Sequence, residues 1–538
     1  MHMKANRMKD KKLFITCAAT VFVMVAAVVA GVVILITKPF GQASSKYETI
    51  VVTSEEDGSS EAENTADDEN TADDENNSMN EVNDVSSNNS KTYNASSASN
   101  VASSNNSIAS GISSDSSDQS SLLSTGDIVS NMNRFYMKMN TAAGLKATVK
   151  EISNSVYNVG NRYRIANVIN KAKSGKGIKI AFLGGSITAT AGANASPATE
   201  SGIKANPSGN SYGNWFCKWF TESFECFVSN IKAGIGATDS VYGTHRLEQD
   251  VLSKKPDLVI LEYDVNDADD NTNKQGTYES IVRKCIDNGT AVIILSFCLD
   301  TGTSSQALHE PIAMHYDIPM ISYRDAFISN SKFAYFTNDG VHPNATGHTL
   351  AAVLLCKYIE NVFNNLDSVE KNDISLPNST VNADAKKYDG AYIAGLKDIY
   401  DNKVEGVRIK DLGSFSFDAT ETKFGYHSYI GLTAEYSENY KPLVIEVDKC
   451  KTAFLHLYRS TKLLGSEFSV SFNGSEINSN TFTCMHGTDN TQTEFEYMYT
   501  TERLCYFEDG KSVTIKITPK ISSRNNQSYV KLFALLLS

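Results

Sequence analysis

The feature that most constrains the fold is a regular alternation of strand-like and helix-like segments between residues 178 and 365. Four strand-like runs of six residues each are separated by segments with helical character: Ile178–Leu183, Phe227–Lys232, Leu258–Tyr263 and Ala291–Ser296. This alternation predicts a parallel sheet covered by helices on both faces. Ligands bind such sheets beyond the carboxyl ends of the strands, so the loops there are the place to look for a site.

One of these loops carries a candidate nucleophile. Gly184, Gly185 and Ser186 follow the first strand-like run, so a serine hydroxyl stands on a glycine turn at a strand end. A serine is a weak nucleophile at its own pKa and needs a base, an orienting acid and donors for an oxyanion. A lone Gly-Gly-Ser would equally suit a helix N-cap. The interpretation therefore depends on partners elsewhere in the chain.

Candidate partners follow in order along the chain. Asp339 and His342 lie three residues apart on a predicted turn before a helix, so His342 is placed to act as base and Asp339 to orient it. The small-residue turn at 233–238 and Asn266, just after a strand-like run, offer oxyanion donors. No Cys-x-x-Cys or His-Glu-x-x-His spacing predicts a metal.

The four blocks together resemble the SGNH hydrolases, a branch of the GDSL-type esterases and lipases, over about residues 160 to 365. Gly185 stands where the GDSL motif has aspartate, and the family's oxyanion glycine falls at Ala237 or, one residue earlier, at Gly236. The resemblance implies a flavodoxin-like three-layer α/β sandwich and a serine esterase without cofactors. It implies these site residues: catalytic Ser186, Asp339 and His342, with an oxyanion hole of the Ser186 amide, the Gly236 or Ala237 amide and the Asn266 side chain.

Other histidines and cysteines match no motif. His309, His315 and His348 are expected to be structural or solvent-facing. Five cysteines in apolar segments are expected to be buried thiols: Cys217, Cys226, Cys285, Cys298 and Cys356.

The N-terminal part of the chain predicts an anchor and a tether. A basic tail, residues 1–12, precedes an apolar run at 13–37 that is long enough for a transmembrane helix or signal anchor. The basic flank predicts a cytoplasmic amino terminus, hence a single-pass protein of the cell membrane with its remaining domains extracellular. Secretion after signal cleavage is the alternative. Residues 38–125 are rich in Ser, Asn and Asp and predict a disordered tether.

After the catalytic domain, predicted at 126–375, the pattern changes to short alternating segments. They predict a β-sandwich accessory domain at 376–538, jelly-roll-like, with strands at Leu443–Val447, Ala453–Tyr458, Phe468–Phe472, Ser512–Thr518 and Tyr529–Leu537. No catalytic motif falls in it. Sugar binding and packing on the catalytic domain remain alternative roles.

These observations predict a membrane-anchored extracellular esterase that removes O-acetyl groups from a polysaccharide through an acyl-enzyme. The alternatives are a lipase or thioesterase on acyl chains, an O-acetyltransferase, and a non-catalytic wall-binding protein. The expected partners are an acetylated polysaccharide or another ester, and the membrane through the N-terminal helix. No nucleic-acid partner is expected, and the sequence does not predict an oligomeric state.

Overall fold

A computed structural model describes residues 122–268, 272–460, 463, 465–473, 475–485, 496–522 and 528–538. These residues all belong to one compact unit, Glu61–Ser538. The expected membrane helix at 13–37 and nearly all of the expected tether lie outside the described residues. Within the described ranges, none of the helices combines the length and the apolar character needed to cross a bilayer.

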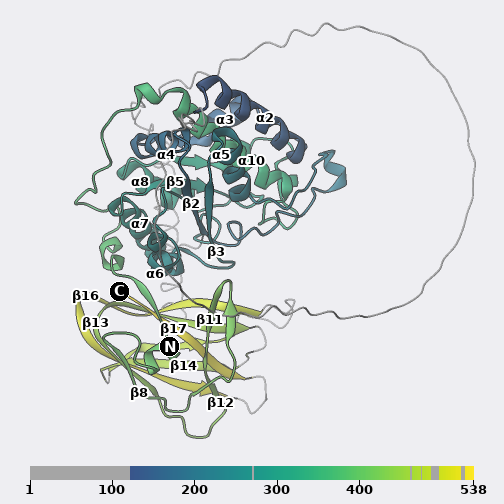
Figure 1. Ribbon diagram of the computed structural model, residues 1–538. Coiled ribbons are helices and arrows are strands. Elements are labelled where there is room, and N and C mark those ends of the chain that lie inside the picture. Colours follow the sequence, from purple (N-terminus) through teal and green to yellow (C-terminus); the bar gives the residue numbers. More distant parts are fainter. Residues whose placement is uncertain are drawn as a thin grey trace, which may run out of the picture. The chain divides into compact units, whose positions relative to one another are not determined.

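The α/β region is built on a six-stranded sheet in the order β1-β6-β5-β4-β2-β3. Figure 1 labels three of its strands, β5, β2 and β3. Its strands are β1 Val156–Asn158, β2 Ile178–Gly184, β3 Val228–Gly234, β4 Leu258–Glu262, β5 Ala291–Ser296 and β6 Met320–Ser322. Five strands are parallel, but β1 pairs with β6 in the antiparallel direction. The sheet is therefore mixed, which corrects the wholly parallel sheet that was predicted. With three residues, β1 is too short to give a readable pattern.

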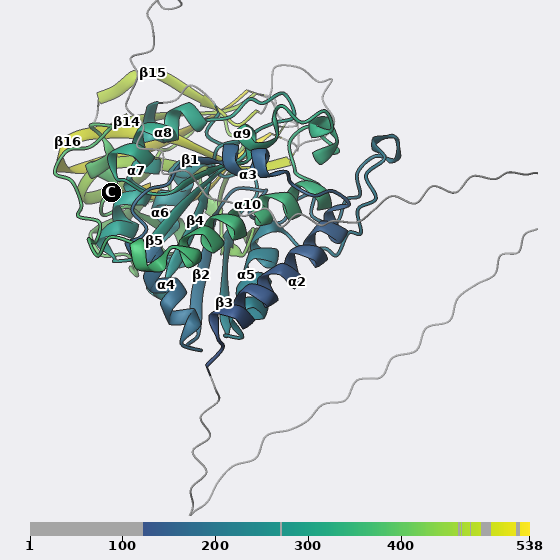
Figure 2. The ribbon, with the colours of Figure 1, turned by 90° about the horizontal axis from the view of Figure 1, so that it is seen from above.

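Helices cover both faces of this sheet (Figure 2). One layer contains α2 Thr125–Ala143, α4 Tyr163–Lys173, α5 Tyr212–Phe224 and α10 Ala345–Asn364. The other contains α6 Ser240–Asp250, α7 Thr272–Asp287 and α8 Gln306–His315. The short helices α3 Val149–Ser155 and α9 Tyr323–Phe327 also belong to the α/β region, whereas α11 Leu396–Tyr400 packs in the core of the C-terminal region.

Alternate residues of each central strand face opposite layers. In β2, Ile180 and Phe182 join the core with α5 and α10, whereas Ala181 and Leu183 join the core with α6 and α7. Both faces of the strand are thus buried over residues 180–183, which is why these residues form a continuous apolar run. This confirms the predicted three-layer α/β architecture. The five cysteines expected as buried thiols are buried.

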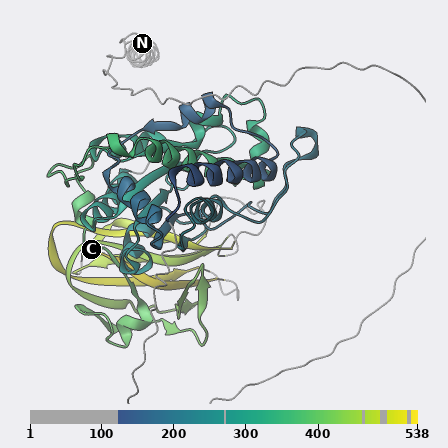
Figure 3. The same ribbon diagram turned by 45° about the horizontal axis from the view of Figure 1, so that its top comes forward.

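The C-terminal region consists mainly of antiparallel strands (Figure 3), as predicted. Its larger sheet contains β7 Tyr392–Gly395, β8 Val407–Asp411, β9 Ser416–Phe417, β12 Leu432–Glu435, β13 Leu443–Ser460, β14 Ser466–Phe472, β15 Ser475–Thr483, β16 Glu496–Ile521 and β17 Tyr529–Leu537.

The long strand β13 changes neighbours halfway along. It pairs with β16 on one edge, while its other edge pairs with β8 at 444–447 and with β17 at 453–457. The change coincides with register shifts between Val447 and Thr452. Such β-bulges bend a strand, and the bend fits the change of neighbour. Buried residues from both halves, such as Ile445 and Leu457, share one core. The jelly-roll connectivity stays a prediction.

A separate hairpin of the C-terminal region, β10 Thr422–Phe424 and β11 His427–Tyr429, contacts the α/β region. Phe424 shares a buried cluster with Ile235 and Tyr242 of that region. At the hairpin turn Gly425 has a φ of +58°, and a Cβ there would lie 3.0 Å from Ile235 Cγ2. A glycine therefore suits both the backbone conformation and the close approach.

Candidate active site

The predicted site residues follow three neighbouring parallel strands. Ser186 comes just after β2, Gly236 and Ala237 just after β3, and Asn266 shortly after β4. Strand β2 lies between β3 and β4 in the sheet, so parallel pairing places these three loops at one edge. His342 reaches the same edge from the turn before α10, whose first residues are capped by Asn344.

The serine, histidine and aspartate form one hydrogen-bonded chain. Ser186 Oγ lies 2.8 Å from His342 Nε2. On the other side of the ring, His342 Nδ1 lies 2.7 Å from Asp339 Oδ2. The second carboxylate oxygen, Oδ1, accepts the amides of Val341 at 2.9 Å and His342 at 2.7 Å. Asp339 is therefore fixed by its own turn and by the ring that it orients.

The charge of Asp339 sets the tautomer of His342. Burial acts to raise the pKa of Asp339, but the hydrogen bonds from the His342 ring and from two backbone amides lower it well below its usual range. An ionised carboxylate accepts the Nδ1 proton, which leaves Nε2 as an acceptor for the serine hydroxyl. The carboxylate side chain is 56% exposed and the imidazole 28% exposed, so the site opens to solvent.

The turn after β3 stands beside the nucleophile. A Cβ built on Gly236 would lie 3.8 Å from the Ser186 Cβ. The next residue, Ala237, has a φ of +57°, in the left-handed region that favours glycine. Thr238 Oγ1 closes the turn by donating to the Ile235 carbonyl at 2.8 Å. The structure thus brings both candidate residues to the site, and the role of their amides as donors stays a prediction.

Asn266 lies against Gly185, the residue at which this chain departs from the GDSL motif. A Cβ on Gly185 would collide with Asn266 Oδ1, so the asparagine side chain lies directly on the glycine. The backbone N–H of Asn266 donates to the Tyr263 carbonyl at 3.0 Å, and this bond makes a tight turn after the end of β4. With Asn266 in this position, an aspartate at residue 185 would not fit.

Sequence reasoning did not identify the buried support under Asn266. His309 lies between the two aspartates that flank Asn266, with Nε2 3.2 Å from Asp267 Oδ2 and Nδ1 3.3 Å from Asp264 Oδ1. Burial acts to lower the pKa of His309, but the two carboxylates outweigh it and raise the pKa to about 9. A charged imidazole therefore holds both ends of the turn. This agrees with the expectation that His309 is structural, although no sequence motif indicates its contacts with Asp264 and Asp267.

A second buried group supports the nucleophile turn. Thr188 Oγ1 donates to Glu262 Oε2 at 2.8 Å and lies 2.8 Å from the Tyr212 hydroxyl. Burial raises the pKa of Glu262 to about 8, and Asp264 and Asp267 add to the effect. Glu262 is therefore protonated at neutral pH, so this layer does not carry another negative charge.

Of the three histidines expected to be structural or solvent-facing, the other two, His348 and His315, differ in burial. His348 is buried; its Nε2 lies 2.8 Å from the Ala191 carbonyl, and burial lowers its pKa to about 4, so a neutral ring supports the loop after Ser186. His315 is partly exposed and bonds the Ser379 carbonyl. Both fit the expectation of structural or solvent-facing residues.

Comparisons with known proteins agree with the four blocks. Residues 182–350 match the family model described as GDSL-like lipase/acylhydrolase family. This match confirms the resemblance drawn from Ser186, the 233–238 turn, Asn266 and the Asp339–His342 block. No curated protein sequence matches the chain.

Two solved structures share the fold beyond that segment. A two-domain esterase described as active on acetylated mannans superimposes with a TM-score of 0.58 at 24% identity, covering 72% of this chain and 98% of that chain. Its structure co-crystallised with mannopentaose gives 0.55 at 24% identity, covering 72% and 97%. Axe2, an acetylxylan esterase from Geobacillus stearothermophilus, gives 0.29 at 20% identity, covering 34% and 95%.

Proposed function

Because residues 182–350 form a GDSL-like lipase/acylhydrolase domain, a hydrolase of ester bonds, we propose that this protein removes O-acetyl groups from a polysaccharide through an acyl-enzyme. The observation that carries the proposal is the hydrogen-bonded chain from Ser186 Oγ through His342 to Asp339. A serine so placed is ready to attack a carbonyl carbon.

In the first half-reaction, Ser186 Oγ attacks the acetyl carbonyl while His342 Nε2 takes its proton. The resulting imidazolium is stabilised by ionised Asp339 and returns the proton to the sugar oxygen as the C–O bond breaks. The sugar hydroxyl leaves, and the acetyl group stays on Ser186. In the second half-reaction, water attacks this ester with the same base, and acetate leaves.

The negative oxygen that forms on the carbonyl needs preorganised donors. We assign this role to the Ser186 amide, the amide of Gly236 or Ala237, and the Asn266 side chain, which come from three adjacent loops. Backbone amides in a turn donate without rotamer freedom, so they favour the charge that develops in the transition state.

Two features support a polysaccharide as substrate. The hydrogen-bonded residues Ser186, His342 and Asp339 open to solvent, because His342 is partly exposed and Asp339 about half exposed. An open site of this kind suits an acetyl group that is carried by a polymer. The fold is shared with a two-domain esterase whose described activity is on acetylated mannans. The same substrate class is our proposal for this chain.

We further propose that catalysis takes place outside the cell. The apolar run at 13–37 and the polar tract at 38–125 support a membrane anchor followed by a tether. A tether of this length would carry the catalytic region away from the bilayer. Protease accessibility of the C-terminal region on intact cells tests this placement, and protection from the protease would contradict it.

The substrate is tested by acetate release from acetylated mannan, acetylated xylan and p-nitrophenyl esters of rising chain length. We expect acetate from at least one glycan and a fall in kcat/KM as the acyl chain lengthens. Ser186→Ala is the matched control for background hydrolysis. A preference for long acyl chains would favour the lipase alternative, and an inert protein with intact fold would reject the proposal.

A further inference from the structure

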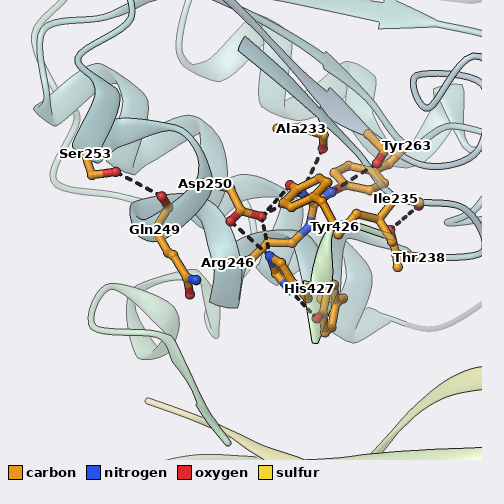
Figure 4. A network of polar contacts seen from close by, with 12 residues as sticks. Ala233, Ile235, Thr238, Arg246, Gln249, Asp250, Ser253, Tyr263, Tyr426 and His427 are labelled. Atoms are coloured by element: carbon orange, nitrogen blue, oxygen red, sulfur yellow. Dashed lines mark hydrogen bonds and ion pairs between the residues drawn. The ribbon is translucent and has the colours of Figure 1, made fainter. Parts of the chain in front are cut away.

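Arg246 of α6 is a fully buried cation that contacts the carboxyl ends of β2 and β3 and the residue just after β4, which lead into three loops with site residues. Its Nη2 donates to the Gly184 carbonyl at 3.1 Å and to the Tyr263 hydroxyl at 2.9 Å. Its Nη1 donates to the Ala233 carbonyl at 2.8 Å. Figure 4 shows this side chain among its partners.

These acceptors lie at the strand ends that precede the site. Gly184 is two residues before Ser186, and Ala233 is three residues before Gly236. The Gly184 carbonyl also accepts the Ile235 amide at 3.1 Å, which ties the ends of β2 and β3 to each other. The Arg246 guanidinium therefore adds a second link between the strand ends that lead into the nucleophile turn and the oxyanion turn.

The guanidinium is in turn held by the C-terminal region. Its Nη1 donates to Asp250 Oδ2 at 3.1 Å and to the Tyr426 hydroxyl at 2.9 Å. The same hydroxyl donates to Asp250 Oδ2 at 2.6 Å, and His427 Nε2 lies 3.1 Å from Asp250 Oδ1. Tyr426 and His427 thus bind the counter-ion of Arg246 from a hairpin about 180 residues further along the chain.

The rings of this hairpin are themselves fixed. His427 Nδ1 lies 2.9 Å from the Tyr242 hydroxyl, which also bonds the Tyr429 hydroxyl at 2.8 Å. The side chain of Asp250 is nearly buried. A buried carboxylate without such partners would bear a large desolvation penalty. The hairpin therefore supplies two of the partners that satisfy the Asp250 carboxylate beside Arg246.

We propose that Tyr426 and His427 are positioning residues for ester hydrolysis at Ser186, acting through Asp250 and Arg246. The C-terminal region, on this inference, completes the frame of the active site and does more than pack beside it. The inference rests on the proposed function, since it concerns the same serine.

The test uses Tyr426→Phe and His427→Gln in the full chain, with p-nitrophenyl acetate as substrate. This ester has no sugar, so a lost sugar contact cannot change its turnover. Tyr426→Phe removes only the hydroxyl that joins Arg246 to Asp250. Tyr400→Phe is the matched control, because Tyr400 lies in the same region with a similar exposure, 48% against 49%, and contacts Phe417 instead of the α/β region.

We expect Tyr426→Phe and His427→Gln each to lower kcat by about tenfold with little change in KM, because a small misplacement of the reacting groups lowers the rate of the chemical step strongly. The double variant should lose less than the product of the two single losses, since both act through Asp250. Tyr400→Phe should keep the wild-type kcat. Rates are compared at a temperature where circular dichroism shows every variant fully folded.

Other outcomes overturn the inference. Unchanged kcat in both variants, even with a lower Tm, would make the hairpin a stabilising contact only. A change confined to KM would make Tyr426 a substrate contact, and fully multiplicative losses would mean independent action. An inert wild-type protein would instead reject the proposed function, so the two failures are distinguishable.

Discussion

The layer beneath the active site and the core of the C-terminal region are both fully buried, yet they differ in chemistry. Beneath the site lie Arg246, Glu262, Asp264, Asp267 and His309. The described core of the C-terminal region is made of residues such as Ile445, Leu455, Phe468 and Leu535. In the first, His309 lies within hydrogen-bonding distance of Asp264 and Asp267, and Arg246 within that of Asp250. The second packs apolar side chains.

This difference separates two tasks. An apolar core stabilises a fold through burial and tolerates small shifts of its side chains. A buried ionic network adds less net stability because its charges lose their hydration, but each partner demands a particular geometry. We therefore expect changes in the charged layer to act on turnover and changes in the apolar core to act on stability.

The largest expected effect is at the nucleophile. Ser186→Ala should lower kcat by about 10⁴-fold or more, with an unchanged Tm, because only a hydroxyl at the surface of the site is lost. His342→Ala should match it, whereas Asp339→Asn should cost less, since the acid only orients the base. Steady-state rates and thermal melts check this. Substantial activity in a clean Ser186→Ala preparation would remove the serine from the mechanism.

Asn266→Ala tests the oxyanion hole above the charged layer. We expect kcat to fall by about 10² to 10³ with little change in KM, the usual loss for one oxyanion donor. Steady-state kinetics on p-nitrophenyl acetate provide both constants. An effect on KM alone would assign Asn266 to substrate binding.

Leu455→Ala tests the apolar core of the C-terminal region. Leu455 is fully buried, so its truncation should lower the free energy of unfolding by about 2–5 kcal/mol. The kcat of the folded protein should stay at the wild-type value. Urea unfolding measures the first quantity and kinetics at low temperature the second. A large fall in kcat would break the contrast between the two regions.

The charged layer should also make stability depend on alkaline pH. The folded-state pKa of His309, about 9, exceeds its reference value of 6.5. The bound proton therefore stabilises the fold fully below pH 6.5, and this contribution is lost as pH rises through 9. We expect urea unfolding to show a loss of about 1–3 kcal/mol over this window. In His309→Gln the loss should be smaller, and an equal loss would exclude His309 as its source.

The smallest expected effect is at Gly185. Gly185→Ala places a methyl group against Asn266 Oδ1 and should lower kcat by about tenfold through displacement of the asparagine. Gly390→Ala is the control, because a Cβ there meets nothing within 4 Å. Wild-type turnover in Gly185→Ala would show that Asn266 can move without loss.

Local patterns predicted the site better than they predicted its support. Ser186, Asn266 and His342 stand at strand ends or before a helix, where a few neighbouring residues reveal the turn. The bond from Arg246 to Tyr426 joins residues about 180 apart and leaves no local signal. Strand β13 was predicted as two strands because polar residues at 448–451 interrupt its apolar pattern, whereas the structure carries the strand through by register shifts.

The hairpin at 422–429 has a consequence for protein engineering. From the sequence, the α/β region looks like an independent domain that could be truncated near residue 376 and fused to other domains. Such a cut would leave Asp250 without Tyr426 and His427, and Glu279 without the backbone amides of Val381 and Asn382. A minimal version of this enzyme must therefore retain the hairpin or replace Asp250 and its counter-ion together, so exchange of whole domains between homologues is constrained at α6.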